Sequence, residues 1–214
     1  MFFGLNAPTI ISRLITLVIA LSVHEFAHAW TANFFGDDTP RLHGRLTLNP
    51  LAHLDPIGSL MLIVAGFGWA KPVPINPYAL QRRSGSATMW VSLAGPLSNL
   101  FLAGLAAIPL RLGVVPFSIS AGLLPSAYLF LRIFIQINLL LMLFNLIPLA
   151  PLDGEKAAQY LFPASWVSFL DTIRPYGPLI LMVLVFVLPS VGIDIIGWTL
   201  LPLFNILWRL LIGV

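Results

Sequence analysis

The sequence predicts an all-α membrane protein, a polytopic helical bundle of about five to six transmembrane segments with a short β-like or re-entrant element after the first helix. Of the 214 residues, 58% are hydrophobic and only 9% are charged, whereas soluble domains usually carry about 25% charged residues. So few charges do not cover a water-facing surface. We therefore expect a single membrane-embedded domain over residues 1–214, with its core at 8–155 and C-terminal helices at 176–213.

The first predicted helix covers residues 8–35 and ends at Gly36, before the polar turn 37–40. It contains the pentapeptide His24-Glu25-Phe26-Ala27-His28. On a helix, the two histidines lie one turn apart on the same face. Polar side chains of this kind are costly against lipid, so we expect them to face the protein interior.

The next stretch is short and polar. Residues 45–48 alternate in the manner of a strand before Asn49-Pro50. Residues 57–70 are apolar but number only about 14, which is too few for a full crossing and is typical of a re-entrant or interfacial segment.

The remaining apolar runs predict further helices. Residues 87–110 and 126–147 are clear spans, and 155–174 is an amphipathic connector. Two final segments follow at 176–188 and 193–211, separated by Pro189, and the first of them is short for a full crossing.

The basic residues are expected to report topology rather than nucleic-acid binding, because the net charge is only +3. If residues 57–70 do not cross the membrane, the basic residues divide unequally between its two faces. The smaller basic group, at one face, is Arg13, Arg111 and Arg132. The larger group then lies at the opposite, cytoplasmic face: Arg41, Arg45, Lys71, Arg82, Arg83, Lys156, Arg174 and Arg209. The chain contains no cysteine, which excludes disulfides and thiolate metal ligands.

Two histidines provide a metal with only two ligands, whereas catalytic zinc usually has three protein ligands and a water. Asp153 is the best candidate for the third, because it follows a proline-rich break after a span and Gly154 permits the backbone to turn. Asp55, His43 and His53 remain alternatives in the polar connector.

Three motifs occur in order on apolar segments: His24 to His28, Ala94-Gly-Pro-Leu-Ser-Asn99, and Asn145-x-x-Pro-x-x-Pro-Leu-Asp153-Gly. Together they resemble the site-2 protease family of intramembrane zinc metalloproteases over residues 8–155, in a minimal form without a PDZ or CBS domain. The resemblance implies that His24, His28 and Asp153 hold one Zn²⁺ and that Glu25 is the catalytic carboxylate. It also implies that Asn99 and Asn145 line the substrate path.

The resemblance implies hydrolysis of peptide bonds within or near transmembrane segments. A water activated by zinc, which lowers its pKa to about 7, would attack the carbonyl with Glu25 as general base and acid. The expected partners are transmembrane-helix substrates and the lipid bilayer, with no nucleic acid. A bacterial-type cell membrane is the expected location, with the site opening toward the cytoplasm. The alternative function is a metal-binding membrane scaffold or ion transporter without proteolytic activity.

Overall fold

The computed structural model describes residues 6–56, 58, 70–118 and 122–213. In these residues the chain is 74% helical and forms no strand. Within the described part of the chain, five helices are long and apolar enough to cross a membrane: Ala7–Phe34, Ala87–Arg111, Ala127–Asn145, Ala164–Ser190 and Ile195–Ile212. The predicted fold class, an all-α polytopic bundle, is confirmed, and the chain is a multi-pass membrane protein.

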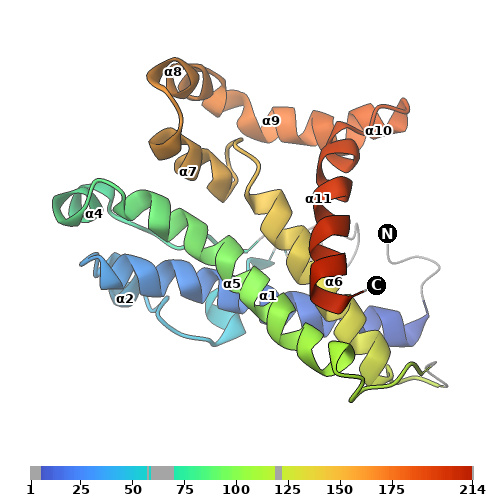
Figure 1. The fold of residues 1–214 in the computed structure, drawn as a ribbon. Helices are drawn as coiled ribbons and strands as arrows, with labels where there is room; N and C mark the ends of the chain where they lie inside the picture. The colour runs from blue at the N-terminus through green and yellow to red at the C-terminus, as the bar shows by residue number, and fades with distance from the viewer. Residues whose placement is uncertain (1–5, 57, 59–69, 119–121, 214) are drawn as a thin grey trace.

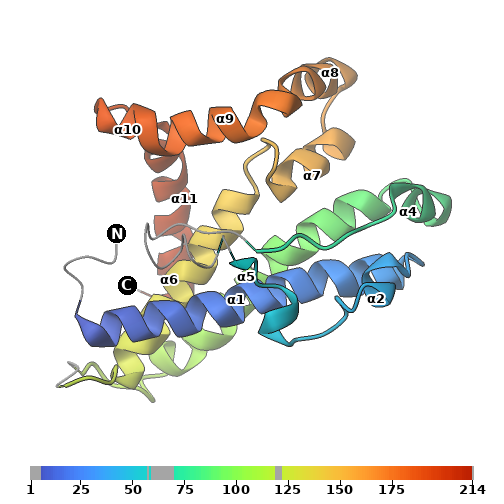
Figure 2. The ribbon, with the colours of Figure 1, turned by 180° about the vertical axis from the view of Figure 1, so that it is seen from behind.

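Helices α1 (Ala7–Phe34), α5 (Ala87–Arg111) and α6 (Ala127–Asn145) form the centre of the bundle and pack against one another (Figures 1 and 2). Small residues in α1 and α5 allow this close approach. Fully or almost fully buried examples are Ala20, Ala29, Ala32, Ala103 and Ala107. The site residues of α1 and α5 therefore lie on facing helix surfaces.

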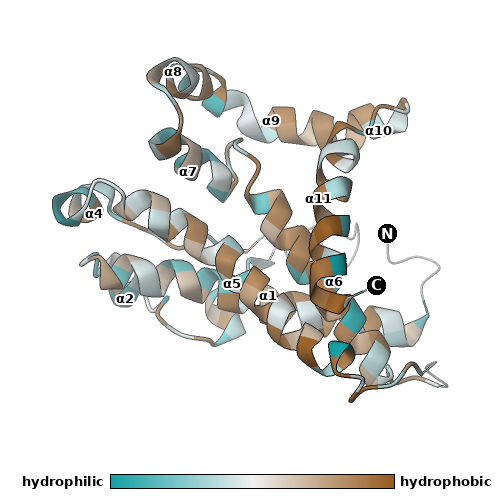
Figure 3. Cartoon of the chain, in the orientation of Figure 1, coloured by the Kyte–Doolittle hydropathy of each residue, from teal (hydrophilic) through white to brown (hydrophobic). Residues whose placement is uncertain are grey.

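Hydrophobic residues also cover much of the outside of the bundle (Figure 3). Many large apolar side chains on α5 and α11 (Ile195–Ile212) are exposed, including Phe101 and Trp198. Hydrophilic residues are more frequent near α2 (Thr39–Leu42) and α4 (Pro77–Arg83). This distribution is the one expected of helices that face lipid.

The strand expected at residues 45–48 is wrong, because these residues form a bend. The Arg45 side chain is buried, and its guanidinium donates hydrogen bonds to the carbonyls of Ala52 and Lys71. The loop thus wraps around a buried cation and ends in the short helix η1 (Pro50–Ala52), which leaves no adjacent strand to pair with.

Most of the 57–70 segment lies outside the described residues, and so does its predicted re-entrant form. Its two ends are described. Leu54 and Ala70 form an isolated antiparallel bridge, and the Lys71 amide donates to the His53 carbonyl at 2.7 Å. The chain therefore enters and leaves this segment at the same place.

The connector expected at 155–174 is divided in the structure. Its first half is α7 (Asp153–Leu161), which ends before Pro163, a residue that lacks the amide needed to continue the helix. Its second half, α8 (Ala164–Ile173), begins the candidate span that ends at Ser190. The rest of that span is η2 (Arg174–Tyr176), α9 (Gly177–Met182), η3 (Val183–Val187) and α10 (Leu188–Ser190).

The placement of Arg209 with the larger basic group is also wrong. Its neighbour Trp208 lies under the Arg132 guanidinium at 5.6 Å, and the Leu210 carbonyl accepts a hydrogen bond from Arg111. Arg209 therefore lies at the end of the bundle that holds the smaller basic group. The reason is visible in Figure 1, where α8 to α10 pass across the bundle and α11 descends from their far end.

Candidate metal centre

Helix α1 carries His24, Glu25 and His28, all of which are buried. The two imidazole rings meet edge to face, with their centroids 4.7 Å apart. This arrangement follows from their spacing of one helical turn. Both Nε2 atoms are directed to one point between α1 and the start of α7.

Asp153 occupies that point. Its Oδ2 atom lies 3.1 Å from Nε2 of His24 and 3.1 Å from Nε2 of His28. One ligand atom from each residue lies within 4.8 Å of the other two. Burial alone raises the pKa of Asp153, but the imidazoles of His28 and His24 outweigh it and hold the pKa well below its usual range. The carboxylate is thus ionised, as a metal ligand must be.

The other ring nitrogens face hydrogen-bond acceptors. His24 Nδ1 lies 2.6 Å from Oδ1 of Asn99, and His28 Nδ1 lies 2.7 Å from the carbonyl oxygen of Val91. These acceptors place the ring hydrogens on Nδ1 and leave the Nε2 lone pairs free to bind a cation. Two imidazoles and a carboxylate are the donor set of many catalytic zinc sites, so the residues fit the metal.

Helix α5 approaches the imidazoles at Gly95, where a side chain is not tolerated. A Cβ atom at this position would lie 2.4 Å from Nε2 of His28 and 2.5 Å from Nε2 of His24. One turn earlier, the Ser92 hydroxyl donates to the Asp153 carbonyl at 2.5 Å. The sequence pattern assigns no role to Val91 and Ser92, and Gly95 is marked only as a member of the Ala94–Asn99 motif.

Gly154 holds the following turn in place. A Cβ atom there would lie 2.3 Å from the Leu146 carbonyl oxygen, so the backbone after Asp153 packs directly on the end of α6. The turn that directs the aspartate to the histidines thus depends on a residue without a side chain.

A cavity of about 740 Å³ opens beside the three ligands. Glu25 and Asn145 lie on its wall, and most of the remaining lining is apolar and comes from α1, α6, α9 to η3, α11 and residues 70–75. Asn99 is fully buried and bonded to His24, so the structure places it behind the metal ligand and not on this wall. The substrate contact of Asn145 stays a prediction.

The alternative third ligands do not join this group. His43 Nδ1 is bonded to the Thr39 carbonyl, and His53 Nε2 is bonded to the Thr47 carbonyl at 2.7 Å. The Asp55 carboxylate accepts from the Gly58 amide at 2.8 Å. Among the residues that the structure describes, Asp153 completes the pair of histidines.

Fold and site together define a multi-pass membrane protein with a candidate metal centre of two buried histidines and a partly buried aspartate. Comparison with known proteins identifies relatives of the same kind. The chain is 43% identical to "Putative zinc metalloprotease YwhC" of Bacillus subtilis, over 82% of this chain and 80% of the relative. It is 35% identical to "Putative zinc metalloprotease Rip2" of Mycobacterium tuberculosis, over 85% of this chain and 67% of the relative.

A second Rip2, from Mycolicibacterium smegmatis, is 35% identical over 78% of this chain, which spans 63% of that relative's length. No protein-family model and no solved structure matches the chain. The chain belongs to the family of these bacterial zinc metalloproteases, and the resemblance to the site-2 protease family is confirmed. The names of the relatives and the His24, His28, Asp153 group support Zn²⁺ as the cofactor.

Proposed function

We propose that the protein is an intramembrane zinc endopeptidase that hydrolyses peptide bonds within or near transmembrane segments of other proteins. The observation that carries the proposal is the position of Glu25. This carboxylate follows the ligand His24 directly in sequence and lies on the wall of a mostly apolar cavity between candidate membrane-spanning helices. A carboxylate next to a candidate metal ligand thus lines a cavity that suits an apolar segment, which supports a role for Glu25 in hydrolysis.

His24, His28 and Asp153 would hold the zinc, which supplies a Lewis acid for the peptide carbonyl and for water. Glu25 would accept a proton from the attacking water and return it to the leaving amine. Asn145, on the same wall, carries an amide that is able to donate and accept hydrogen bonds with the backbone of an extended substrate.

The size of the cavity supports an extended substrate. Its 740 Å³ falls among sites of roughly 300–1,000 Å³ that hold small ligands. Such a volume accommodates a few residues but not a whole helix with its side chains. An intact helix also uses its carbonyls internally. We propose that the transmembrane substrate unwinds locally before it reaches Glu25.

The proposed location is a bacterial cell membrane, with the metal centre opening toward the cytoplasm. The larger basic group, even without Arg209, supports this orientation, because cytoplasmic loops carry an excess of lysine and arginine. Lys156, a member of that group, lines the cavity beside the metal centre.

Glu25→Gln tests the function. In vesicles that contain the purified chain and a model transmembrane substrate, the variant should lose cleavage and keep its zinc, because the ligands are unchanged. Asp38→Asn, which removes an exposed carboxylate directly before α2, should cleave at the parent rate. Cleavage by Glu25→Gln at the parent rate would refute the proposal. Transport of Zn²⁺ by the same vesicles without any cleavage would favour the transporter alternative.

A further inference from the structure

Asn138 lies in the middle of α6 and is fully buried. It is one of two buried amides joined in a hydrogen-bonded chain across three helices. Asn138 Nδ2 donates to the Phe134 carbonyl at 2.8 Å, and Asn138 Oδ1 accepts from Asn99 Nδ2 at 2.9 Å. Asn99 Oδ1 lies 2.6 Å from His24 Nδ1. We call this series, from the Phe134 carbonyl through Asn138 and Asn99 to His24, the amide relay.

A backbone carbonyl only accepts, so it sets the direction of every hydrogen bond in the amide relay. The Phe134 carbonyl requires the amide nitrogen of Asn138, which turns Asn138 Oδ1 toward Asn99. That oxygen requires a donor, so Asn99 presents Nδ2 to it and Oδ1 to His24. Asn99 Oδ1 in turn requires the His24 hydrogen on Nδ1. The Nε2 lone pair of His24 is thereby directed at the metal position.

His28 reaches the same state by a shorter path, because its Nδ1 donates directly to the Val91 carbonyl. A backbone oxygen thus orients His28 directly, whereas His24 is oriented through Asn99. The Asn99 nitrogen donates to Asn138 Oδ1 at 2.9 Å and, over a longer distance of 3.4 Å, to the Ala20 carbonyl. A reversed Asn99 amide would set its oxygen against Asn138 Oδ1 and its N–H against the Nδ1 hydrogen of His24. Both contacts would leave buried polar groups unsatisfied, which is unfavourable.

We propose that Asn138 is a positioning residue of the zinc site, which fixes the Asn99 amide and thereby holds His24 in the tautomer that binds metal. Asn138 is not among the residues that line the cavity, so its effect is indirect. The inference rests on the zinc site and not on the substrate. Zinc affinity therefore tests it whether or not the chain cleaves peptides.

Asn138→Leu removes both hydrogen bonds while keeping a side chain of similar size. We expect zinc to bind about 10–100-fold more weakly, as for other residues that orient a metal ligand. Competition with a chromophoric chelator on the purified full chain measures this affinity. Gln136→Leu, on the exposed surface of the same helix, should bind zinc like the parent. A folded Asn138→Leu protein with the parent affinity would overturn the inference.

Asn138→Asp provides a second test if the leucine variant does not fold. When its buried carboxyl is protonated, the O–H group donates to the Phe134 carbonyl and the other oxygen accepts from Asn99. Both hydrogen bonds are then kept, so the zinc affinity should stay within a few-fold of the parent. Thermal unfolding of the metal-free variant establishes whether it folds. A folded Asn138→Asp protein that loses as much affinity as Asn99→Ala would contradict the amide relay.

The relay also requires the two amides to act as one unit. In an Asn99→Ala background, Asn138→Leu should cause no further loss of zinc affinity. A residue that served only to pack α6 against α5 would contribute its own loss in that background. Additive losses in the double variant would therefore overturn the proposal.

Discussion

Oδ2 of Asp153 lies 3.1 Å from Nε2 of His24, although 129 residues separate them in the sequence. Two contacts with the core establish this proximity. Ser92 on α5 donates to the Asp153 carbonyl, and Gly154 packs on the end of α6. The metal centre is therefore closed by the packing of α5 and α6 against α1.

Replacing Asp153 with alanine should lower the zinc content of the purified protein, because only two of the three ligands remain. Elemental analysis and chelator competition measure the change, and cleavage should fall with it. Asp171→Ala, which removes an exposed carboxylate on α8, is the matched control. Unchanged zinc affinity in Asp153→Ala would move the third ligand to another residue, such as Asp55.

Gly95→Ala should disrupt the metal centre, because the added methyl group would lie within 2.5 Å of His24 Nε2 and closer still to that of His28. We expect zinc affinity to fall about tenfold or more. Gly104 lies on the same helix with nothing within 4 Å of an added Cβ. Gly104→Ala should therefore bind zinc normally, and an equal loss in the two variants would point to a general effect on α5.

Substitutions of Asn145 and Asn99 should have different effects. Asn145 lies on the cavity wall, whereas Asn99 lies behind His24. Asn145→Ala should keep the parent zinc affinity while kcat/KM falls about tenfold, the effect of one lost hydrogen bond of about 1.4 kcal/mol. Asn99→Ala should weaken zinc binding. Loss of zinc in Asn145→Ala would contradict the substrate role of this amide.

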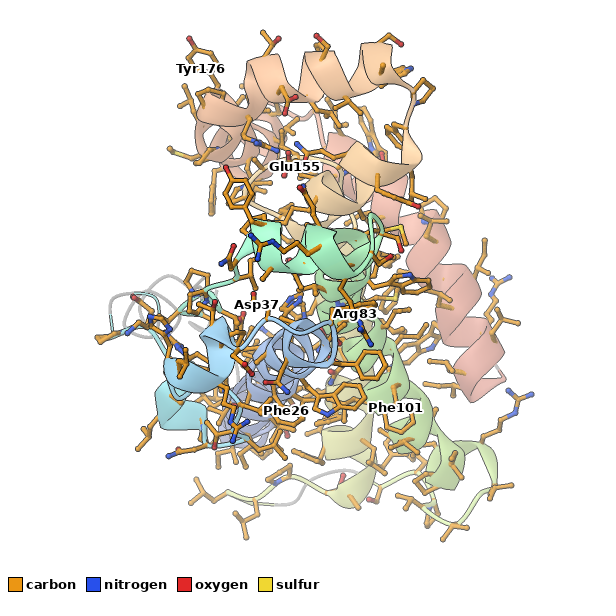
Figure 4. The ribbon with its side chains drawn as sticks, turned by 90° about the vertical axis from the view of Figure 1, so that its left-hand side faces the viewer. Phe26, Asp37, Arg83, Phe101, Glu155 and Tyr176 are labelled. Atoms are coloured by element: carbon orange, nitrogen blue, oxygen red, sulfur yellow. The ribbon has the colours of Figure 1, made fainter. Side chains whose placement is uncertain are left out.

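Arg174 joins the C-terminal segment, which we define as α8 to α10, to α7, the helix that begins at Asp153. Its guanidinium donates to the buried Glu155 carboxylate, with Nε 2.9 Å from Oε1, and Figure 4 shows Glu155 on the inner side of this segment. Arg174→Gln would leave that carboxylate with a weaker partner. We expect a loss of about 1–2 kcal/mol of stability, reduced from the value for a fully buried pair because Arg174 is 46% exposed.

Thermal unfolding in detergent, with and without zinc, measures the effect of Arg174→Gln. Arg83→Gln, at the exposed end of α4, should change stability by less than about 0.5 kcal/mol. If both variants unfold like the parent, the ion pair does not fasten the C-terminal segment to α7.

The fold class was predictable, and so was the grouping of His24, His28 and Asp153, because their signals are local or chemical. Apolar runs of sufficient length indicate spans, and the spacing of His24 and His28 places both on one face of a helix. Asp153 could be predicted from the prolines that precede it and the glycine that follows it. The alternation at 45–48 was misleading because the buried Arg45 guanidinium, and not a neighbouring strand, organises that loop.

The amino-acid sequence by itself determined that the chain spans a membrane and that a histidine pair with a nearby carboxylate faces the protein interior. Those properties follow from composition and helical periodicity, which are local and do not depend on how the helices pack. Only the tertiary structure decided that Asn99 lies behind His24, that Asn138 stands behind Asn99, and that Arg209 shares an end with Arg132. The reason is that these positions depend on how helices α5, α6 and α11 rotate and cross when they pack.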